Sequence, residues 1–465
     1  MPEDPAYALA AHVTGTPYEA LPASTVTATK RDILDTFGCM VGGGGAPGIA
    51  ALYEMADEWG GREESRVLLH GRRLPAPAAA LLNASMGHAL DFDDTHDTAG
   101  SIHPGVSVLA AGLAMADTLG GVDGKRFLRA AALGLDVSCR IALASTLDRG
   151  WHRTACIGIF GATVTAGLLL GLDAERMRHA LGIAYSHAAG NRQCILDGAL
   201  TKRLQAGQAA SAGVFSAILA AKDFTGAHNI FTGKYGFLEL YQPNGADASL
   251  LLQDLGTAFR GEGLSFKPYP CGRPLHAGID AALAAHARLG LTDARQLAEV
   301  TIALDKAAHA DQFESGPHKR RPTQVVEAQF ALPFLIATAL THGKVGIGEV
   351  SGLGDDATLA LSDRIAGQAV PDAKPRDWLT LTVRLTDGRG VSIETGDPIG
   401  SPEKPLDAEG MRAKFRDCAG NAMRPITAGT VERCIATLET LETLEDIGIL
   451  MNRLESRDRP GNGFP

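Results

Sequence analysis

The uncharged segment Thr154-Ala-Cys-Ile-Gly-Ile-Phe-Gly-Ala-Thr-Val-Thr-Ala-Gly-Leu-Leu-Leu-Gly-Leu172 decides how the first half of this chain folds. Its length is close to the minimum for a transmembrane helix. However, threonines and glycines interrupt the apolar run, and the sequence holds no second segment of this kind. We therefore predict a central helix of a globular domain, buried on all sides by neighbouring helices.

Helical patterning continues on both sides of this segment, from about residue 5 to residue 260. Asp173 precedes Ala-Glu-Arg-Met as a helix N-cap, and Gly120-Gly121 ends another helix. The many alanines and glycines favour helices whose axes approach closely. After the proline-rich stretch Ser401-Pro-Glu-Lys-Pro405, helical patterning returns. The sequence thus predicts one all-helical domain made of residues 1–265 and 403–465.

Residues 266–402 have a different pattern. Leu297–Leu304 and Trp378–Thr386 alternate apolar with polar residues, which predicts half-buried strands. Asp387-Gly388-Arg389-Gly390 then leads into Val391–Glu394, which is a hairpin signal. The predicted fold class is mainly α, with a large all-helical domain and a smaller α+β lid domain inserted before the C-terminal helices. The chain is longer than a single core normally supports, and a cleft between two domains is a common place for an active site.

Charge and cysteine usage narrow the class of protein. The 465 residues carry a formal net charge of −10, which argues against binding to nucleic acid and to anionic membranes. The seven cysteines are scattered without a CxxC pair, so they indicate reduced cytoplasmic thiols rather than a zinc knuckle or disulfides. The first residues, Met1-Pro-Glu-Asp-Pro5, lack the basic and apolar regions of a signal peptide. We therefore expect a cytoplasmic protein.

A dense cluster of acids and imidazoles is the strongest functional signal. It consists of His88-Ala-Leu-Asp-Phe-Asp-Asp-Thr-His96, then Asp97, then Ser101-Ile-His103-Pro104. A carboxylate beside imidazoles is the minimum equipment for moving a proton. The alternative is a loop whose acids cap neighbouring helix N-termini. The density of titratable groups next to small apolar residues favours function.

Two metal-dependent interpretations of the same cluster stay open. Asp93-Asp94-Thr95-His96-Asp97 fits the DDxxD pattern by which terpene synthases hold magnesium diphosphate. Against this, the sequence shows no second metal motif and few aromatic residues to line a carbocation cavity. A metal site made of His88, Asp91 and His96 is also possible, although the spacing matches no strong template.

Basic residues form further candidate sites. Trp151-His152-Arg153 precedes the uncharged helix, and Lys202-Arg203 lies near the start of another. Ser265-Phe-Lys267-Pro-Tyr-Pro-Cys-Gly-Arg273-Pro-Leu-His276 lies at the predicted domain junction. Its prolines stiffen the backbone, and rigid basic groups in a cleft suit carboxylates, which arginine can pair in a bidentate manner. The alternative is a stiff linker with solvated charges.

Together these segments resemble the MmgE/PrpD family, whose members include 2-methylcitrate dehydratase, cis-aconitate decarboxylase and iminodisuccinate epimerase. The resemblance runs in order through almost the entire chain. It is carried by Leu82-Asn-Ala, His88–Thr95, His103-Pro104, Leu170–Glu175, Ala180–Ala184, Thr201-Lys202, Lys267–Pro270 and Glu327–Gly343. It implies a helical domain with an α+β lid and a homodimer that needs no metal or organic cofactor.

The resemblance also implies site residues. The positions that match the polar residues lining the family's cleft are Asp91, Thr95, His103, His152, Lys202 and Lys267. Two positions depart from the cis-aconitate decarboxylase branch: Gly272 stands where a histidine is expected, and Phe334 stands where a tyrosine is expected. Both departures disfavour the decarboxylase assignment and leave the fold assignment unchanged.

The resulting prediction is a cofactor-independent, dehydratase-like lyase that acts on a small di- or tricarboxylate by proton transfer alpha to a carboxylate. Fixed positive donors would stabilise the enolate-like charge that develops. The predicted catalytic residues are the acid and base candidates His103 and His152, the orienting Asp91, and Lys202 and Lys267. The predicted substrate-binding residues are Thr95, Arg273 and His276. Alternatives are an epimerase of a dicarboxylate such as iminodisuccinate, a decarboxylase of the cis-aconitate type, a magnesium-dependent prenyl-diphosphate enzyme, and a non-catalytic binding protein.

Overall fold

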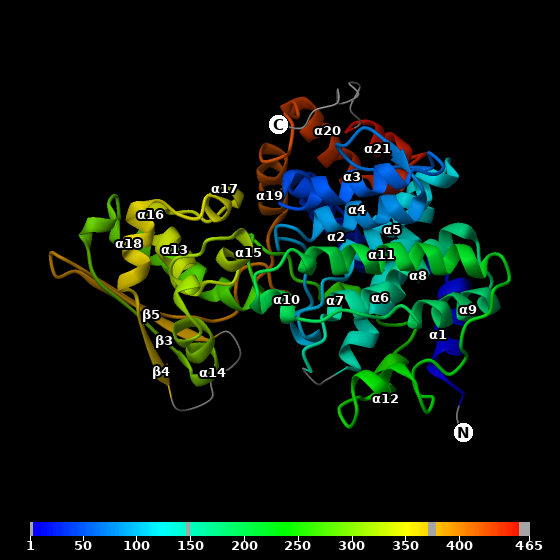
Figure 1. Cartoon of the computed structure of the whole chain (residues 1–465), viewed down its shortest axis with the longest axis horizontal. Coiled ribbons are helices and arrows are strands. Elements are labelled where there is room, and N and C mark those ends of the chain that lie inside the picture. The colour runs from blue at the N-terminus through cyan, green and yellow to red at the C-terminus, as the bar shows by residue number, and fades with distance from the viewer. Residues whose placement is uncertain (1–2, 146–148, 371–377, 455–465) are drawn as a thin grey trace.

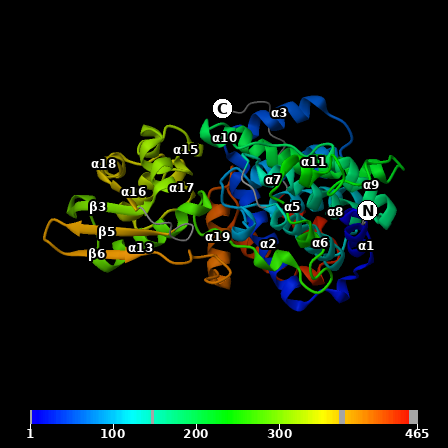
Figure 2. The same ribbon diagram turned by 90° about the horizontal axis from the view of Figure 1, so that it is seen from below.

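The protein is mainly α-helical and contains two large hydrophobic clusters. The structure, a computed structural model, describes residues 3–145, 149–370 and 378–454; the rest of both predicted domains lies outside the described residues. The first cluster takes its side chains from the first 266 residues and from Met411 onward, and the second takes them from Tyr269–Ile393. Figures 1 and 2 show the sheet-containing part beside the helical part in both views.

The helical part surrounds α8 (Gly158–Leu170), whose residues are buried up to Leu169. The other helices before residue 250 are α1 (Pro5–Gly15), α2 (Ala23–Gly42), α3 (Ile49–Trp59), α4 (Ala76–Gly87), α5 (Pro104–Leu119), α6 (Gly124–Leu143), α7 (Arg153–Cys156), α9 (Ala174–Tyr185), α10 (Gln193–Leu196), α11 (Thr201–Ala220) and α12 (Phe237–Tyr241). The short strands β1 (Ser65–Arg66) and β2 (Arg73–Leu74) pair antiparallel.

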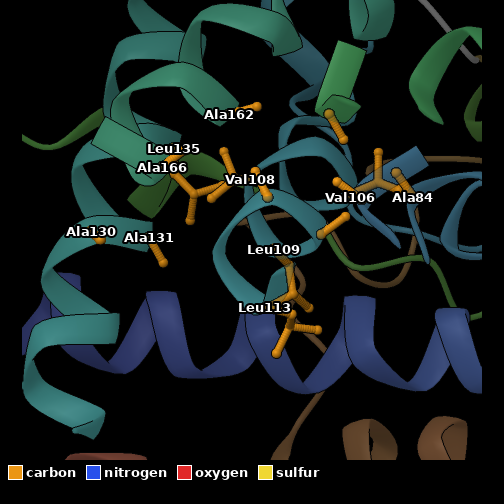
Figure 3. Close-up of a cluster of buried hydrophobic side chains, with 14 of the residues drawn as sticks. Ala84, Val106, Val108, Leu109, Leu113, Ala130, Ala131, Leu135, Ala162 and Ala166 are labelled. Atoms are coloured by element: carbon orange, nitrogen blue, oxygen red, sulfur yellow. The ribbon is translucent and has the colours of Figure 1, made fainter. Parts of the chain in front are cut away.

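Small residues let the central helices approach closely (Figure 3). A Cβ atom added to Gly161 of α8 would lie 2.2 Å from Ser138 Oγ of α6, and one added to Gly134 of α6 would lie 2.1 Å from Thr165 Oγ1 of α8. Only glycine therefore fits on either side of this crossing. The alanine- and glycine-rich composition predicted this kind of packing.

The uncharged segment is a buried core helix, as predicted. Within the described residues, Arg153–Leu170 is the one helical segment with the length and composition to cross a membrane, and 89% of it is buried inside the protein. The prediction of a single continuous helix is wrong, because the chain turns at Ile157 between α7 and α8. A Cβ atom on the next residue, Gly158, would lie 2.9 Å from Ser107 Oγ, so this turn brings α8 against α5.

The second part holds a four-stranded sheet of order β4-β3-β5-β6. Its strands are β3 (Leu297–Asp305), β4 (Ala366–Val370), β5 (Leu379–Leu385) and β6 (Gly390–Glu394). β3 pairs parallel with β4 and antiparallel with β5, which also pairs antiparallel with β6. The alternating patterns predicted β3, β5 and the hairpin to β6. They did not predict β4, because this largely exposed edge strand has no apolar alternation.

Helices make up much of the rest of this part. They are α13 (His276–Leu289), α14 (Lys306–His309), α15 (Val325–Ala328), α16 (Leu332–His342), α17 (Ile347–Ser351) and α18 (Asp356–Arg364). A Cβ atom on Gly278 of α13 would meet Leu332 of α16 and Leu379 of β5 at 2.9 and 3.0 Å, so α13 lies directly between the two. The second core forms at this contact.

The C-terminal helices pack on the helical part. They are α19 (Ala408–Gly420), α20 (Ala428–Glu439) and α21 (Gly448–Asn452). Phe415 of α19 stacks on Phe37 of α2, and a Cβ atom on Gly38 would meet the Phe415 ring at 3.1 Å. The domain boundaries themselves stay a prediction.

Candidate active site

A cavity of about 770 Å³ holds most of the predicted site residues. Its walls come from both parts of the chain. From the helical part they include Asp91, Ser101, His103, Trp151, His152, Arg192 and Lys202. From the part of the chain after residue 266 they include Lys267, Gly272, Arg273, Gln312, Lys319, Glu327 and Phe330.

Three predicted residues stand at the beginnings of helices that face this cavity. His103 immediately precedes α5, His152 immediately precedes α7, and Lys202 is the second residue of α11. The long helices α5 and α11 present the positive ends of their dipoles there. The local sequence explains the start of α5, because Pro104 has the fixed φ and the missing N–H that suit a first helical position. This end of the cavity therefore favours anions.

Asp91 joins two lysines from distant parts of the chain. Its Oδ1 accepts hydrogen bonds from Lys267 Nζ at 2.7 Å and from Lys202 Nζ at 3.2 Å, and its backbone oxygen accepts from Lys267 at 2.9 Å. Its φ of 50° lies in the left-handed region, which non-glycine residues rarely adopt and which occurs often at functional sites. Burial raises the pKa of this carboxyl, but the two ammonium groups outweigh burial and hold the pKa well below its ordinary value. Asp91 is therefore ionised.

His103 and His152 both present Nε2 as a free base. His103 Nδ1 lies 2.5 Å from the Asp94 carbonyl oxygen, which can only accept, so Nδ1 carries the proton. His152 Nδ1 lies 3.1 Å from Gln205 Oε1, which already accepts from the Asn191 N–H, so Nδ1 donates here too. Burial lowers the pKa of both rings well below the usual value, helped by Lys267 at His103 and by His88 at His152. No described residue hydrogen-bonds either Nε2 atom, so both are available in the cavity.

His88 lies behind these groups and is fully buried. Its Nδ1 is 2.7 Å from Asp93 Oδ2, and its Nε2 is 2.9 Å from Lys202 Nζ. Its ring centroid is 5.1 Å from that of His103 and 5.4 Å from that of His152. Burial first, and then Lys202, lowers the pKa of His88 well below its ordinary value, so the ring is neutral.

The three predicted substrate-binding residues are placed differently. Arg273 lines the cavity, but its Nη2 and Nε donate to Asp97 at 2.9 and 3.1 Å, and its Nη1 donates to the Ile399 carbonyl at 3.0 Å. It therefore binds protein groups first. Neither Thr95 nor His276 is among the residues that line the cavity, and their role in substrate binding stays a prediction. Thr95 pairs through its backbone with Ser265, and His276 is buried with Nε2 donating to the Cys271 carbonyl.

The geometry does not favour the metal interpretations of the acidic cluster. His88, Asp93 and His103 have potential ligand atoms within 4.8 Å of one another. However, the Nδ1 atoms of both rings carry protons, and a cation there would approach two ammonium groups. Among the described residues, the predicted metal ligands His88, Asp91 and His96 do not come together as a set.

The DDxxD acids have protein partners rather than an open face. Asp93 accepts from His88, and Asp97 pairs with Arg273. Asp94 is buried, and burial together with Asp32 raises its pKa well above the ordinary value. None of these three acids lines the cavity, so the arrangement does not suit magnesium diphosphate.

Two residues that contact the site residues were missed in the sequence. Gln205, which contacts His152 and does not line the cavity, follows Lys202 by three residues on α11, so helical spacing was a usable signal for it. Phe330 left no such signal, although its ring lies 5.8 Å from Lys202 Nζ and only 2.9 Å from the position of a Cβ atom on Gly272. This ring closely covers the position where the decarboxylase branch has histidine. Phe334, the other departure, is buried in the second core away from the cavity.

Comparisons with known proteins show the family of this chain. Models of the MmgE/PrpD N-terminal and C-terminal domains match residues 7–248 and 269–440. A cis-aconitate decarboxylase-like protein of Aspergillus oryzae is 25% identical over 93% of this chain and 94% of its own length. Cis-aconitate decarboxylases of Mus musculus and Homo sapiens are 26% and 25% identical, over 92% and 93% of this chain and 88% and 90% of their own lengths. The chain belongs to the MmgE/PrpD family.

Proposed function

We propose that this protein is a lyase that removes water from a small di- or tricarboxylate by proton transfer alpha to a carboxylate. One observation carries the proposal: two ammonium groups joined through Asp91 share a cavity with two neutral imidazoles whose Nε2 atoms are free. The first pair supplies positive charge for carboxylates, and the second supplies bases.

The reaction follows from these roles. Lys202 and Lys267 each use two of their three N–H donors on protein groups, so one donor of each is left for the substrate. Nε2 of His103 or His152 takes the proton from the alpha carbon, and the lysines stabilise the enolate-like charge. The bond from the beta carbon to its hydroxyl then breaks. The hydroxyl leaves with the proton held by the imidazolium, so water is released and the ring returns to its neutral form.

Decarboxylation is a second candidate, because the three relatives compared above carry that activity, or likeness to it, in their names. In that reaction the bond to a carboxylate breaks and the resulting carbanion takes a proton. Epimerisation needs only removal of the alpha proton and its return to the opposite face. All three reactions share the proton transfer, and they differ in what leaves the substrate.

The proposal includes the arrangement predicted from the sequence. Residues 266–402 would act as a lid domain over the cavity, which is supported by their separate hydrophobic cluster and by the cavity walls they supply. A homodimer, a cytoplasmic location and independence from metals and organic cofactors belong to the same proposal. Light scattering of the purified protein tests the dimer.

NMR in deuterium oxide tests the proposed activity. The purified protein is incubated with a panel of di- and tricarboxylates, including hydroxy acids and cis-aconitate. Alpha-deuteration with loss of water supports the hydro-lyase, release of carbon dioxide supports the decarboxylase, and exchange with loss of optical purity supports an epimerase. No exchange, loss of water or release of carbon dioxide with any acid would overturn the proposal and favour a non-catalytic binding protein.

A further inference from the structure

His88 and Asp93 have no role in the proton transfer described above, yet they are fully buried directly behind it. Burying polar groups is costly unless each has a partner. The hydrogen bonds form one continuous chain from Asp93 Oδ2 to His88 and from His88 to Lys202 Nζ. Among the described residues, this chain of hydrogen bonds reaches the cavity through Lys202, and Asp93 Oδ2 also lies 3.8 Å from His103 Nδ1.

The direction of each hydrogen bond follows from the chemistry of its end. A lysine ammonium has three donors and no acceptor, so His88 Nε2 must accept from Lys202. The proton of the neutral ring is then on Nδ1, which donates to Asp93. The carboxylate therefore fixes the tautomer that Lys202 needs, as carboxylates bonded to the far nitrogen of a catalytic or metal-binding histidine do.

We propose that Asp93 and His88 form a positioning dyad that holds the Lys202 ammonium, so that its remaining N–H points into the cavity toward a substrate carboxylate. His88 takes one donor at 2.9 Å and Asp91 takes a second at 3.2 Å. The Phe330 ring lies beside the same ammonium on the lid side, at 5.8 Å from its centroid. With two donors bound by protein, the third is left for a ligand.

The dyad also influences the charge state of Lys202. The charged and titratable groups that face this ammonium are Asp91, Asp93, His88, His152, Lys267 and Cys194. Burial lowers the pKa of Lys202, and Asp91 and then Asp93 oppose this effect. Because the neutral His88 accepts a stronger hydrogen bond from the charged amine than from the neutral one, its loss should lower the pKa of Lys202 further.

Acylation of lysines by acetic anhydride across a pH series, followed by mass spectrometry, measures this effect without substrate. Only the neutral amine reacts, so the midpoint of the labelling curve reports the pKa of each lysine. In His88→Phe, the midpoint for Lys202 should move to lower pH. Asp93→Asn keeps an acceptor for Nδ1 and should give a smaller shift in the same direction. His96→Phe replaces a buried ring on the same loop, outside the cavity, and should leave the Lys202 midpoint unchanged.

Turnover provides a second measurement, which rests on the proposed function. His88→Phe should lower kcat/KM about 10- to 100-fold, as expected for losing a hydrogen bond to a charged group. It should also move the alkaline limb of the pH profile to lower pH, whereas a merely structural change would lower the rate equally at every pH.

The two measurements separate the possible failures. An unchanged Lys202 midpoint in His88→Phe would overturn the dyad, whatever happens to turnover. If the Lys202 midpoint shifts in His88→Phe but the wild-type protein exchanges no acid, the proposed function is overturned and the dyad is kept. If His88→Phe does not fold, His88→Asn, which is too short to reach Lys202 and leaves the Asp93 charge in place, decides by the same shift to lower pH.

Discussion

Two buried sites in this protein combine aspartate with lysine, and the pKa of the aspartate is shifted in opposite directions in the two sites. At the cavity, Asp91 contacts Lys202 and Lys267, and its pKa lies well below the ordinary value. Behind it, Asp35 contacts Lys414 at 2.5 Å, yet burial raises the pKa of Asp35 from 3.8 to about 6 in spite of this lysine. The same two residue types thus form an ionised site in one place and a partly protonated one in the other.

The neighbours of each pair explain the difference. Asp91 has an excess of cations, whereas Asp35 shares its region with other carboxyls, Asp32 and Asp94. Burial raises the pKa of both of these acids well above the ordinary value. Asp35 and Asp93 raise that of Asp32 further, and Asp32, Asp93 and Asp35 raise that of Asp94. The Lys414 ammonium is used by Asp35 and by the Phe92 carbonyl. The Asp91 site, which we propose to be functional, thus keeps charge available to a ligand, whereas Lys414 is used within the protein.

The largest expected effect comes from removing a base at the cavity. His103→Asn keeps a donor near the position of Nδ1 for the Asp94 carbonyl and removes Nε2. Because general-base catalysis contributes about 10²- to 10⁴-fold, alpha-proton exchange followed by NMR should fall by that factor. His70→Asn, which changes a buried histidine beside Tyr53, is the matched control and should keep wild-type exchange. Exchange within about threefold of wild type in His103→Asn would remove His103 from the mechanism.

Lys267→Met tests the cavity pair directly. Losing one fixed donor to the developing enolate should lower the exchange rate about 10²- to 10³-fold. Lys202 still neutralises Asp91, so the variant should remain folded by circular dichroism. If Lys267→Met folds and keeps the wild-type exchange rate, the functional contrast between the Asp91 site and the Asp35–Lys414 site is wrong.

Lys414→Met should instead affect stability. Removing one partner of a buried ion pair costs about 3–5 kcal/mol, which urea denaturation can measure. The exchange rate per folded molecule should stay close to wild type because Lys414 does not line the cavity. The double variant Asp35→Leu with Lys414→Met should recover part of the loss, since it leaves no unpaired charge. If Lys414→Met were as stable as wild type but impaired in exchange, Lys414 would have a functional role and not a structural one.

The pH dependence of stability gives the smallest effect. The folded state raises the pKa of Asp35 from 3.8 to about 6, so it binds this proton more tightly than the unfolded chain does. The resulting stabilisation, about 2–3 kcal/mol, is present in acid and disappears as the pH rises through this window. Asp35→Asn cannot titrate, so its free energy of unfolding should fall less than that of wild type between about pH 4 and 6. Parallel curves would show that Asp35 titrates normally.

Local sequence determined much of the fold. The uncharged run at Thr154–Leu172 and the alternation in β3 and β5 are periodic patterns over neighbouring residues, and burial follows such patterns directly. The break at Ile157 and the edge strand β4 were missed, because close helix contacts and a distant partner strand decide them.

The chemical types at the site were also visible in the sequence, including Asp91, His103 and Lys267. Only the tertiary structure decided their protonation states and tautomers. Lys202 and Lys267 reach Asp91 across 111 and 176 positions of sequence, and the tautomers of the histidines depend on their partners in space. Thr95 lies within the same motif but does not face the cavity. A sequence shows which groups can ionise, whereas burial and neighbouring charges, which exist only in the fold, decide which of them do.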